Sequence, residues 1–170
     1  YGSGITVEGA GFLLNNEMDD FSAKPGSANG YGLIGGKANA IQPKKRPLSS
    51  MTPSILFDSN NNPILATGTP GGSTIITIVM QMILNTIEFN MGIAEATAAP
   101  RIHHQWLPDT VSYENGISID SLNILSGMGH NISPKARVLG STQSIASKSS
   151  FLEGSADSRR QGAAALPQKK

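Results

Sequence analysis

Cysteine is missing from all 170 residues, so the sequence excludes disulfide bonds and thiolate metal sites. Such a chain is compatible with an oxidising or a reducing compartment. Charge is also scarce: charged residues make up 15% of the chain, the formal net charge is +1, and no long block of one sign occurs. This charge pattern disfavours nucleic acid as a partner. The longest apolar run, residues 75–84, is interrupted by Thr77 and Gln81 and is too short to cross a bilayer.

The opening residues, Tyr1-Gly2-Ser3-Gly4, contain no Met and neither the basic nor the apolar segment of a signal peptide. We therefore expect that a segment precedes Tyr1 in the parent protein. The length suits one domain with a sizeable core. We assign residues 1–160 to part of a single domain, and residues 161–170, which are small, polar and basic, to a flexible tail.

Apolar patterning predicts a chain of mixed α and β structure. Strands are expected where short apolar runs lie between polar turns, at residues 12–14, 54–57, 64–67, 140–146 and 151–155. Helices are expected at residues 75–87, 93–99 and 120–125. Residues 22–47 carry many glycines and prolines without either period, which predicts a long loop. Tyr31, Leu33 and Ile34 give that loop the apolar groups of a lid.

The segment Gly68-Thr69-Pro70-Gly71-Gly72-Ser73 lies between a predicted strand and a predicted helix. Adjacent glycines let the backbone approach a ligand closely, and N–H groups at a helix start favour an anion or a developing oxyanion. A nucleotide-binding P-loop requires a Lys before its Ser or Thr, so that interpretation is rejected. Spacing alone leaves an ordinary glycine turn as the commoner explanation.

Two further polar segments are candidate binding sites. Glu17, Asp19 and Asp20 form a carboxylate cluster that can hold an ammonium group or a divalent cation. The EF-hand spacing is absent, and a solvated turn is an equal alternative. Ser49 and Ser50 can bind a carboxylate, but no Gly-x-Ser-x-Gly motif surrounds them, which disfavours a hydrolase nucleophile and leaves a plain turn open.

His103 and His104 are sequence neighbours, and neighbouring side chains of a strand point to opposite faces, so they are not expected to share a metal. A packed structural histidine beside Trp106 is the preferred interpretation. The sequence predicts neither a metal nor another cofactor.

Four segments in this order resemble the small subunit of γ-glutamyltransferases: Leu13-Leu14-Asn15-Asn16-Glu17-Met18-Asp19-Asp20-Phe21-Ser22, Lys45-Arg46-Pro47-Leu48-Ser49-Ser50-Met51, Gly68-Thr69-Pro70-Gly71-Gly72-Ser73, and Ala99-Pro100-Arg101 with His103-His104-Gln105-Trp106-Leu107-Pro108-Asp109. The resemblance runs to about Arg159. It implies an α+β N-terminal-nucleophile hydrolase with an αββα sandwich, made by self-cleavage of a precursor into a large and a small subunit that form a heterodimer. The family's small subunit begins at a nucleophilic threonine, and Tyr1-Gly2 resembles the end of that opening signature. We therefore expect the nucleophile to lie outside this chain and the chain alone to be inactive.

The implied reaction is cleavage of a γ-glutamyl amide such as glutathione, with transfer of the acyl group to water, an amino acid or a peptide. By resemblance, Gly71 and Gly72 would form the oxyanion hole. Glu17 and Asp20 would hold the substrate α-amino group, and Ser49 and Ser50 would bind its α-carboxylate beside an arginine of the large subunit. Residues 25–36 would form the lid, with Tyr31 as its cover. The family's bacterial members are usually periplasmic or secreted.

Two departures from the family pattern concern local packing or subunit contacts. Thr74 stands where an Arg is common, and Ala156-Asp157-Ser158-Arg159 stands where Ser-Asp-Pro-Arg is typical. Two alternatives stay open. A related acylase would act on another amide such as a glutaryl β-lactam, although that group has no ammonium for Glu17 and Asp20 to bind. A non-catalytic paralogue would serve as an interaction module.

Overall fold

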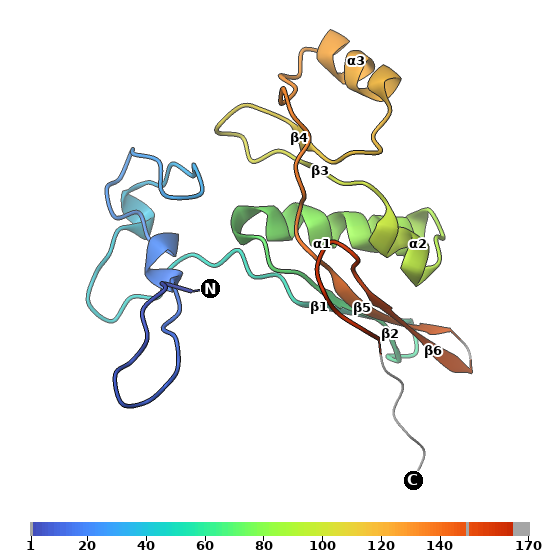
Figure 1. The fold of residues 1–170 in the computed structure, drawn as a ribbon, viewed down its shortest axis with the longest axis horizontal. Helices are drawn as coiled ribbons and strands as arrows, with labels where there is room; N and C mark the ends of the chain where they lie inside the picture. The colour runs from blue at the N-terminus through green and yellow to red at the C-terminus, as the bar shows by residue number, and fades with distance from the viewer. Residues whose placement is uncertain (1, 149, 165–170) are drawn as a thin grey trace. The chain divides into compact units, whose positions relative to one another are not determined.

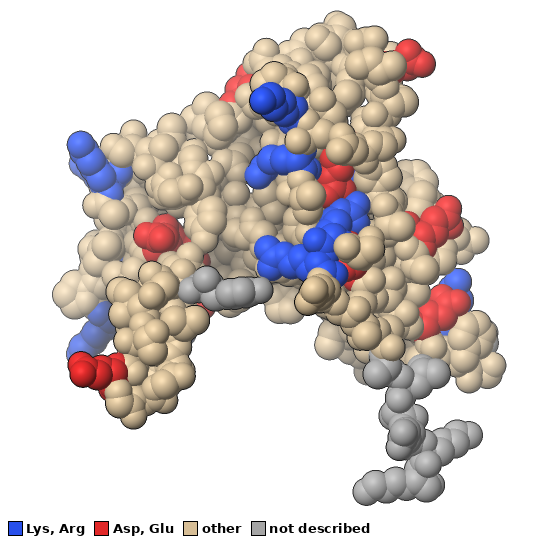
Figure 2. Space-filling model, in the orientation of Figure 1, with Lys and Arg blue, Asp and Glu red and all other residues tan. Residues whose placement is uncertain are grey.

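The computed structural model describes residues 2–148 and 150–164. It divides into two compact units, Tyr1–Ser49 and Ser50–Lys170. Tyr1, and with it part of the predicted opening signature, lies outside the described residues, as does the predicted tail from residue 165 on. In the described part of the chain, no helix has the length and apolar character needed to span a bilayer. Charged side chains of both signs are sparse on the face shown in Figure 2.

The first unit consists of turns and two short 3-10 helices, η1 (Glu17–Asp20) and η2 (Lys37–Asn39). A single bridge, Thr6 to Leu13, replaces the strand predicted to end at residue 14. Glycines at positive φ, including Gly9 and Gly11, interrupt the extended backbone there, which shortens the ladder. The predicted loop at residues 22–47 is confirmed, with η2 inside it.

The second unit is built on an antiparallel sheet of four strands in the order β1-β2-β5-β6 (Figure 1). The strands are β1 (Ser54–Phe57), β2 (Pro63–Gly68), β5 (Gln143–Lys148) and β6 (Phe151–Ala156), which confirms the four predicted in this region. The β1–β2 turn is closed by Asp58, whose Oδ1 accepts hydrogen bonds from the N–H groups of Asn60 and Asn62 at 2.9 and 2.8 Å. An Asx turn of this kind sets the hairpin by local chemistry.

Helices α1 (Ile75–Ile83) and α2 (Ile93–Ala98) cover one face of this sheet (Figure 1). A π-helical turn, Leu84–Glu88, continues α1 to the predicted end of the helix. The apolar core joins Leu65 and Ala146 of the sheet to Met82, Ile93 and Ala96 of the helical layer. This pairing of a helical layer with a sheet is what one half of an αββα sandwich requires.

The remaining elements form a smaller region of the second unit. α3 (Ile119–Gly127) confirms the helix predicted at residues 120–125, and Ser118 Oγ caps it by accepting from Ser121 N at 3.1 Å. β3 (Ile102–His103) pairs with β4 (Ser112–Tyr113), a strand that the sequence analysis missed. A two-residue strand has too few positions to show an alternating pattern.

Candidate functional site

The glycine turn between β2 and α1 has a backbone that only glycine adopts easily. Gly71 has φ of 151° and Gly72 has φ of 57°, and Gly72 opens the 3-10 turn η3 (Gly72–Thr74) that leads into α1. A Cβ on Gly71 would lie 2.4 Å from Thr74 Oγ1. Gly72 is therefore required for its backbone conformation, and Gly71 is required for both its conformation and the space around it.

The hydrogen bonds of this turn leave its two amide N–H groups available. Thr74 donates to Gly71 O from its backbone N at 3.2 Å and from Oγ1 at 2.9 Å. Within the described residues, neither Gly71 N nor Gly72 N donates to another protein group. Unpaired N–H groups just ahead of a helix carry partial positive charge, so the turn can bind an anion or stabilise a developing oxyanion. Thr74, the departure from the family pattern, thus holds the turn closed.

A second segment packs against this turn at Gly140, whose φ is 65°. Ser141 N donates to Thr69 Oγ1 at 2.9 Å, and Thr69 Oγ1 donates to Pro70 O at 2.8 Å. A Cβ on Gly140 would lie 2.5 Å from Thr69 Oγ1 and 3.0 Å from Pro70 O. The approach of this segment to the turn therefore depends on glycine at position 140.

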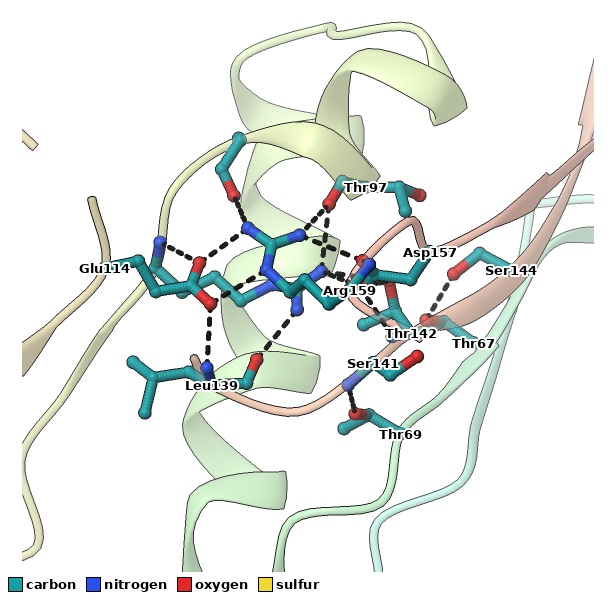
Figure 3. Close-up of polar contacts among 12 residues, drawn as sticks. Thr67, Thr69, Thr97, Glu114, Leu139, Ser141, Thr142, Ser144, Asp157 and Arg159 are labelled. Carbon is teal, nitrogen blue, oxygen red and sulfur yellow. Dashed lines mark hydrogen bonds and ion pairs between the residues drawn. The ribbon is translucent and has the colours of Figure 1, made fainter. Parts of the chain in front are cut away.

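Four buried or nearly buried charges contact that segment, and Figure 3 labels three of them, Glu114, Asp157 and Arg159. Arg101 Nη2 pairs with Asp157 Oδ2 at 2.7 Å, and Arg159 pairs with Glu114 through Nε at 2.8 Å and through Nη2. Arg159 Nη1 also contacts Asp157 Oδ1 at 3.1 Å. The two arginines and two carboxylates cancel one another's charge, which makes their burial tolerable. We call this set the ionic cluster.

The ionic cluster makes hydrogen bonds to the backbone on both sides of Gly140. Glu114 Oε1 accepts from Leu139 N at 2.7 Å, Arg101 Nη1 donates to Leu139 O at 2.8 Å, and Asp157 Oδ2 accepts from Thr142 N at 2.8 Å. Burial by itself raises the pKa of Asp157, but hydrogen bonds from Arg159 N, the Arg101 guanidinium and Thr142 N outweigh it and lower this pKa to about 2.

Sequence reasoning missed this cluster. In the sequence, Asp157 and Arg159 belong to the altered Ser-Asp-Pro-Arg motif and Arg101 belongs to another motif. Glu114 belongs to none of the motifs. The partners are as many as 56 residues apart, and no sequence spacing indicates such a pairing. Ser158, which replaces the usual Pro, is exposed and leaves both ion pairs of its neighbours intact.

The carboxylate cluster of the first unit lies in η1. The pKa of Asp20 is raised, first by partial burial and then by the negative charges of Glu17 and Asp19. Crowded carboxylates of this kind favour a bound cation, such as an ammonium group. The predicted lid contacts the same turn, since Asn16 Nδ2 donates to the Tyr31 hydroxyl at 2.9 Å and Asn29 Nδ2 donates to Asp19 O at 3.2 Å.

Ser49 is exposed and Ser50 is half-buried, and the division between the two units falls between them. The carboxylate cluster belongs to the first unit and the glycine turn to the second. A joint site made by Gly71 and Gly72 with Glu17, Asp20 and the two serines stays a prediction.

The two histidines have different environments. His103 is buried, as predicted, and its pKa is lowered by burial. Trp106 is 74% exposed, so it is not the predicted packing partner of that histidine. His104 pairs with Asp109 at 3.0 Å on the surface. Among the described residues, no group of three His, Asp or Glu side chains converges to hold a metal.

Comparisons with known proteins agree with the motifs. The family model for gamma-glutamyltranspeptidase matches residues 1–166. The glutathione hydrolase proenzyme of Escherichia coli is 54% identical over 145 residues, which cover 85% of this chain and 25% of the proenzyme. The chain thus spans about a quarter of that curated relative.

Solved structures extend the likeness to the fold. A gamma-glutamyltranspeptidase chain from Pseudomonas nitroreducens, complexed with L-DON, matches with a TM-score of 0.89 at 43% identity, covering 98% of this chain and 88% of that one. The Helicobacter pylori T380A mutant matches with a TM-score of 0.87 at 52% identity, covering 94% and 87%. The predicted α+β fold of the N-terminal-nucleophile hydrolases is confirmed. On its motifs, its fold and these matches, the chain belongs to the γ-glutamyltranspeptidase family.

Proposed function

We propose that this chain supplies the oxyanion hole and the head-group site of a γ-glutamyltransferase that acts on γ-glutamyl amides such as glutathione. The glycine turn is the observation that carries the proposal. Gly71 and Gly72 present two adjacent N–H groups just before α1, and neither donates to another group among the residues that the structure describes. Amide cleavage develops negative charge on the carbonyl oxygen, and such donors stabilise it.

The reaction proceeds by acyl transfer. The hydroxyl of the family's threonine nucleophile attacks the γ-carbonyl carbon, and the threonine's own α-amino group takes the hydroxyl proton. The carbonyl oxygen takes up negative charge beside Gly71 and Gly72 until the C–N bond breaks, and the same proton passes to the leaving nitrogen, which departs as an amine. The resulting ester is then attacked by water, an amino acid or a peptide, which releases glutamate or a new γ-glutamyl amide.

The first unit binds the amino-acid end of the substrate in this proposal. Glu17 and Asp20 receive the α-ammonium group, whose positive charge would offset the partial burial and the neighbouring negative charges that raise the pKa of Asp20. Ser49 and Ser50 bind the α-carboxylate together with an arginine of the large subunit, the heterodimer partner. Tyr31 covers the bound head group from the lid, held by its hydrogen bond to Asn16.

The test uses the parent protein that carries this chain. Purified parent protein is expected to hydrolyse a γ-glutamyl anilide and to release the aniline faster when a dipeptide acceptor is added. A glutaryl anilide, which lacks the α-ammonium group, serves as the matched control and is expected to react poorly. Equal turnover of both anilides would favour the acylase alternative, and no turnover of either would overturn the enzymatic proposal. We further propose a periplasmic or secreted location, which fractionation of cells that express the parent protein tests.

A further inference from the structure

The residue that follows the glycine pair is tied to a distant glutamine. Ser73 is half-buried, and its hydroxyl donates to Gln105 Oε1 at 2.8 Å. The same oxygen contacts His103 Nε2 at 2.9 Å. Gln105 Nε2 donates to Leu107 O at 3.1 Å, and this contact orients the amide with its oxygen toward Ser73 and His103.

These contacts assign the hydrogen at one nitrogen of the His103 ring. Because Gln105 Oε1 is an acceptor only, His103 Nε2 carries the hydrogen that lies between them. On the other side of the ring, Thr77 Oγ1 lies 2.8 Å from Nδ1 and also donates to Thr74 O at 3.0 Å. Thr77 is in the first turn of α1, one helical turn beyond Ser73. The imidazole therefore connects the start of α1 to the glutamine that holds Ser73.

The glycine turn needs such an anchor. Gly71 and Gly72 have the widest conformational freedom of any residues, yet an oxyanion hole works only when its N–H groups keep a fixed direction. Thr74 fixes the carbonyl of Gly71, and Thr69 connects the turn to Ser141. Gly71 O and Gly72 N–H belong to one planar peptide group, so Thr74 orients that N–H from one side. Ser73 lies on the other side of Gly72, and its hydrogen bond restricts rotation of the Gly72 backbone there.

We propose that Ser73, Gln105 and His103 are positioning residues that hold the N–H groups of Gly71 and Gly72 in the direction an oxyanion requires. This inference rests on the proposed function. None of the three touches the reacting atoms in it. Their hydrogen bonds act through the backbone of the turn.

The chain contains a matched control in the same helix. Gln81 also connects α1 to the segment that carries His103, through Nε2 to Ile102 O at 2.8 Å and Oε1 from Ile102 N at 3.0 Å. Gln81 lies eight positions beyond Ser73 in the chain, away from the glycine turn. Its loss removes a comparable bridge between the two segments but no contact of the turn.

The experiment measures kcat, KM and melting temperature of the parent enzyme with a γ-glutamyl anilide, with kcat referred to the fraction of cleaved precursor. Ser73→Ala and Gln105→Met are each expected to lower kcat by roughly tenfold with KM nearly unchanged. A glycine N–H group that is no longer held in direction stabilises the oxyanion of the transition state less, but it does not affect substrate binding. That loss lies below the 10²–10³-fold effect of removing an oxyanion donor outright. Ser73→Thr, which keeps the hydroxyl, is expected to stay within about twofold of the wild type. The double variant is expected to fall no further than Gln105→Met alone, because Gln105→Met already breaks the contact that Ser73→Ala removes.

Gln81→Met separates positioning from general stability. It is expected to lower the melting temperature at least as much as Ser73→Ala while leaving kcat within about twofold of the wild type. The positioning proposal is overturned if Ser73→Ala keeps the wild-type kcat, if Gln81→Met loses kcat equally, or if the effects of Ser73→Ala and Gln105→Met add in full. A wild-type enzyme without turnover overturns the proposed function and the positioning proposal with it. Wild-type turnover with unchanged variants overturns the positioning proposal alone.

Discussion

Removing Arg101 from the ionic cluster tests how strongly this cluster stabilises the protein. The Arg101 side chain is 2% exposed, and its guanidinium donates to Leu139 O, Thr97 O, Thr142 Oγ1 and Asp157 Oδ2. Arg101→Met keeps most of the side-chain volume but deletes the charge and every one of these donors. Arg159 still donates to Thr97 O and Asp157 Oδ1, so Thr97 and Asp157 each keep a hydrogen bond from a guanidinium.

The expected loss follows from what is left behind. Leu139 O becomes a buried acceptor without its guanidinium donor, which costs about 1–3 kcal/mol. The cluster also gains a net negative charge, and breaking a buried pair from one side typically costs about 3–5 kcal/mol in total. We expect the free energy of unfolding of the parent protein to fall by about 3–5 kcal/mol, measured by urea denaturation at neutral pH.

The matched control is Lys148→Met. Lys148 Nζ lies 3.6 Å from Glu153 Oε2, and its side chain is 46% exposed, so its loss is expected to cost less than about 1 kcal/mol. The reasoning is refuted if Arg101→Met and Lys148→Met shift the unfolding midpoint equally. It is also refuted if Arg101→Met unfolds at the wild-type midpoint with an unchanged slope.

Three further predictions follow from other features. The pKa of Asp157 is lowered to about 2 from an ordinary value of 3.8, so its contribution of roughly 2 kcal/mol to the free energy of unfolding is present above pH 3.8 and is lost as the pH falls from there toward 2. Urea unfolding between pH 5 and 2 should show this extra loss in the wild type and not in Asp157→Asn. Gly140→Ala places a Cβ 2.5 Å from Thr69 Oγ1 at a φ of 65°, so it is expected to lower the free energy of unfolding by about 2–4 kcal/mol and to reduce kcat. Gly127→Ala, whose Cβ would have no atom within 4 Å, is expected to change neither quantity in melting and turnover assays. Asp20→Asn is expected to raise KM for a γ-glutamyl anilide roughly 10–100-fold, because it removes a charge-assisted hydrogen bond to the α-ammonium group. The reaction of a glutaryl anilide is expected to be unaffected, and an equal effect on both substrates would contradict the ammonium site.

The parts of the fold that the sequence predicted are those set by local chemistry. The β1–β2 hairpin was predictable because Asp58 and the asparagines that follow it close their own turn. α1 was predictable because apolar residues recur at helical spacing over its length. The strand expected near residue 14 contracted to one bridge because its alternating apolar residues are separated by glycines at positive φ.

The candidate site was predictable only where a motif is contiguous. The glycine turn is six consecutive residues, and its strand-to-helix setting followed from the patterns on either side. The Ser73–Gln105 contact and the ionic cluster join residues tens of positions apart, and their geometry arises only when the chain folds. Single-sequence patterns contain no signal for such contacts.

The ionic cluster also bears on the local opening of the second unit. Leu139 N and Thr142 N donate to carboxylates that are themselves held by Arg159 and Arg101, so neither amide reaches water unless the charges separate. The amide hydrogens of Leu139 and Thr142 should therefore exchange with solvent among the slowest in the unit, although both residues lie outside every helix and strand. The slowest-exchanging part of this unit would then include an irregular segment fastened by charge, beside the apolar layer between α1 and the sheet.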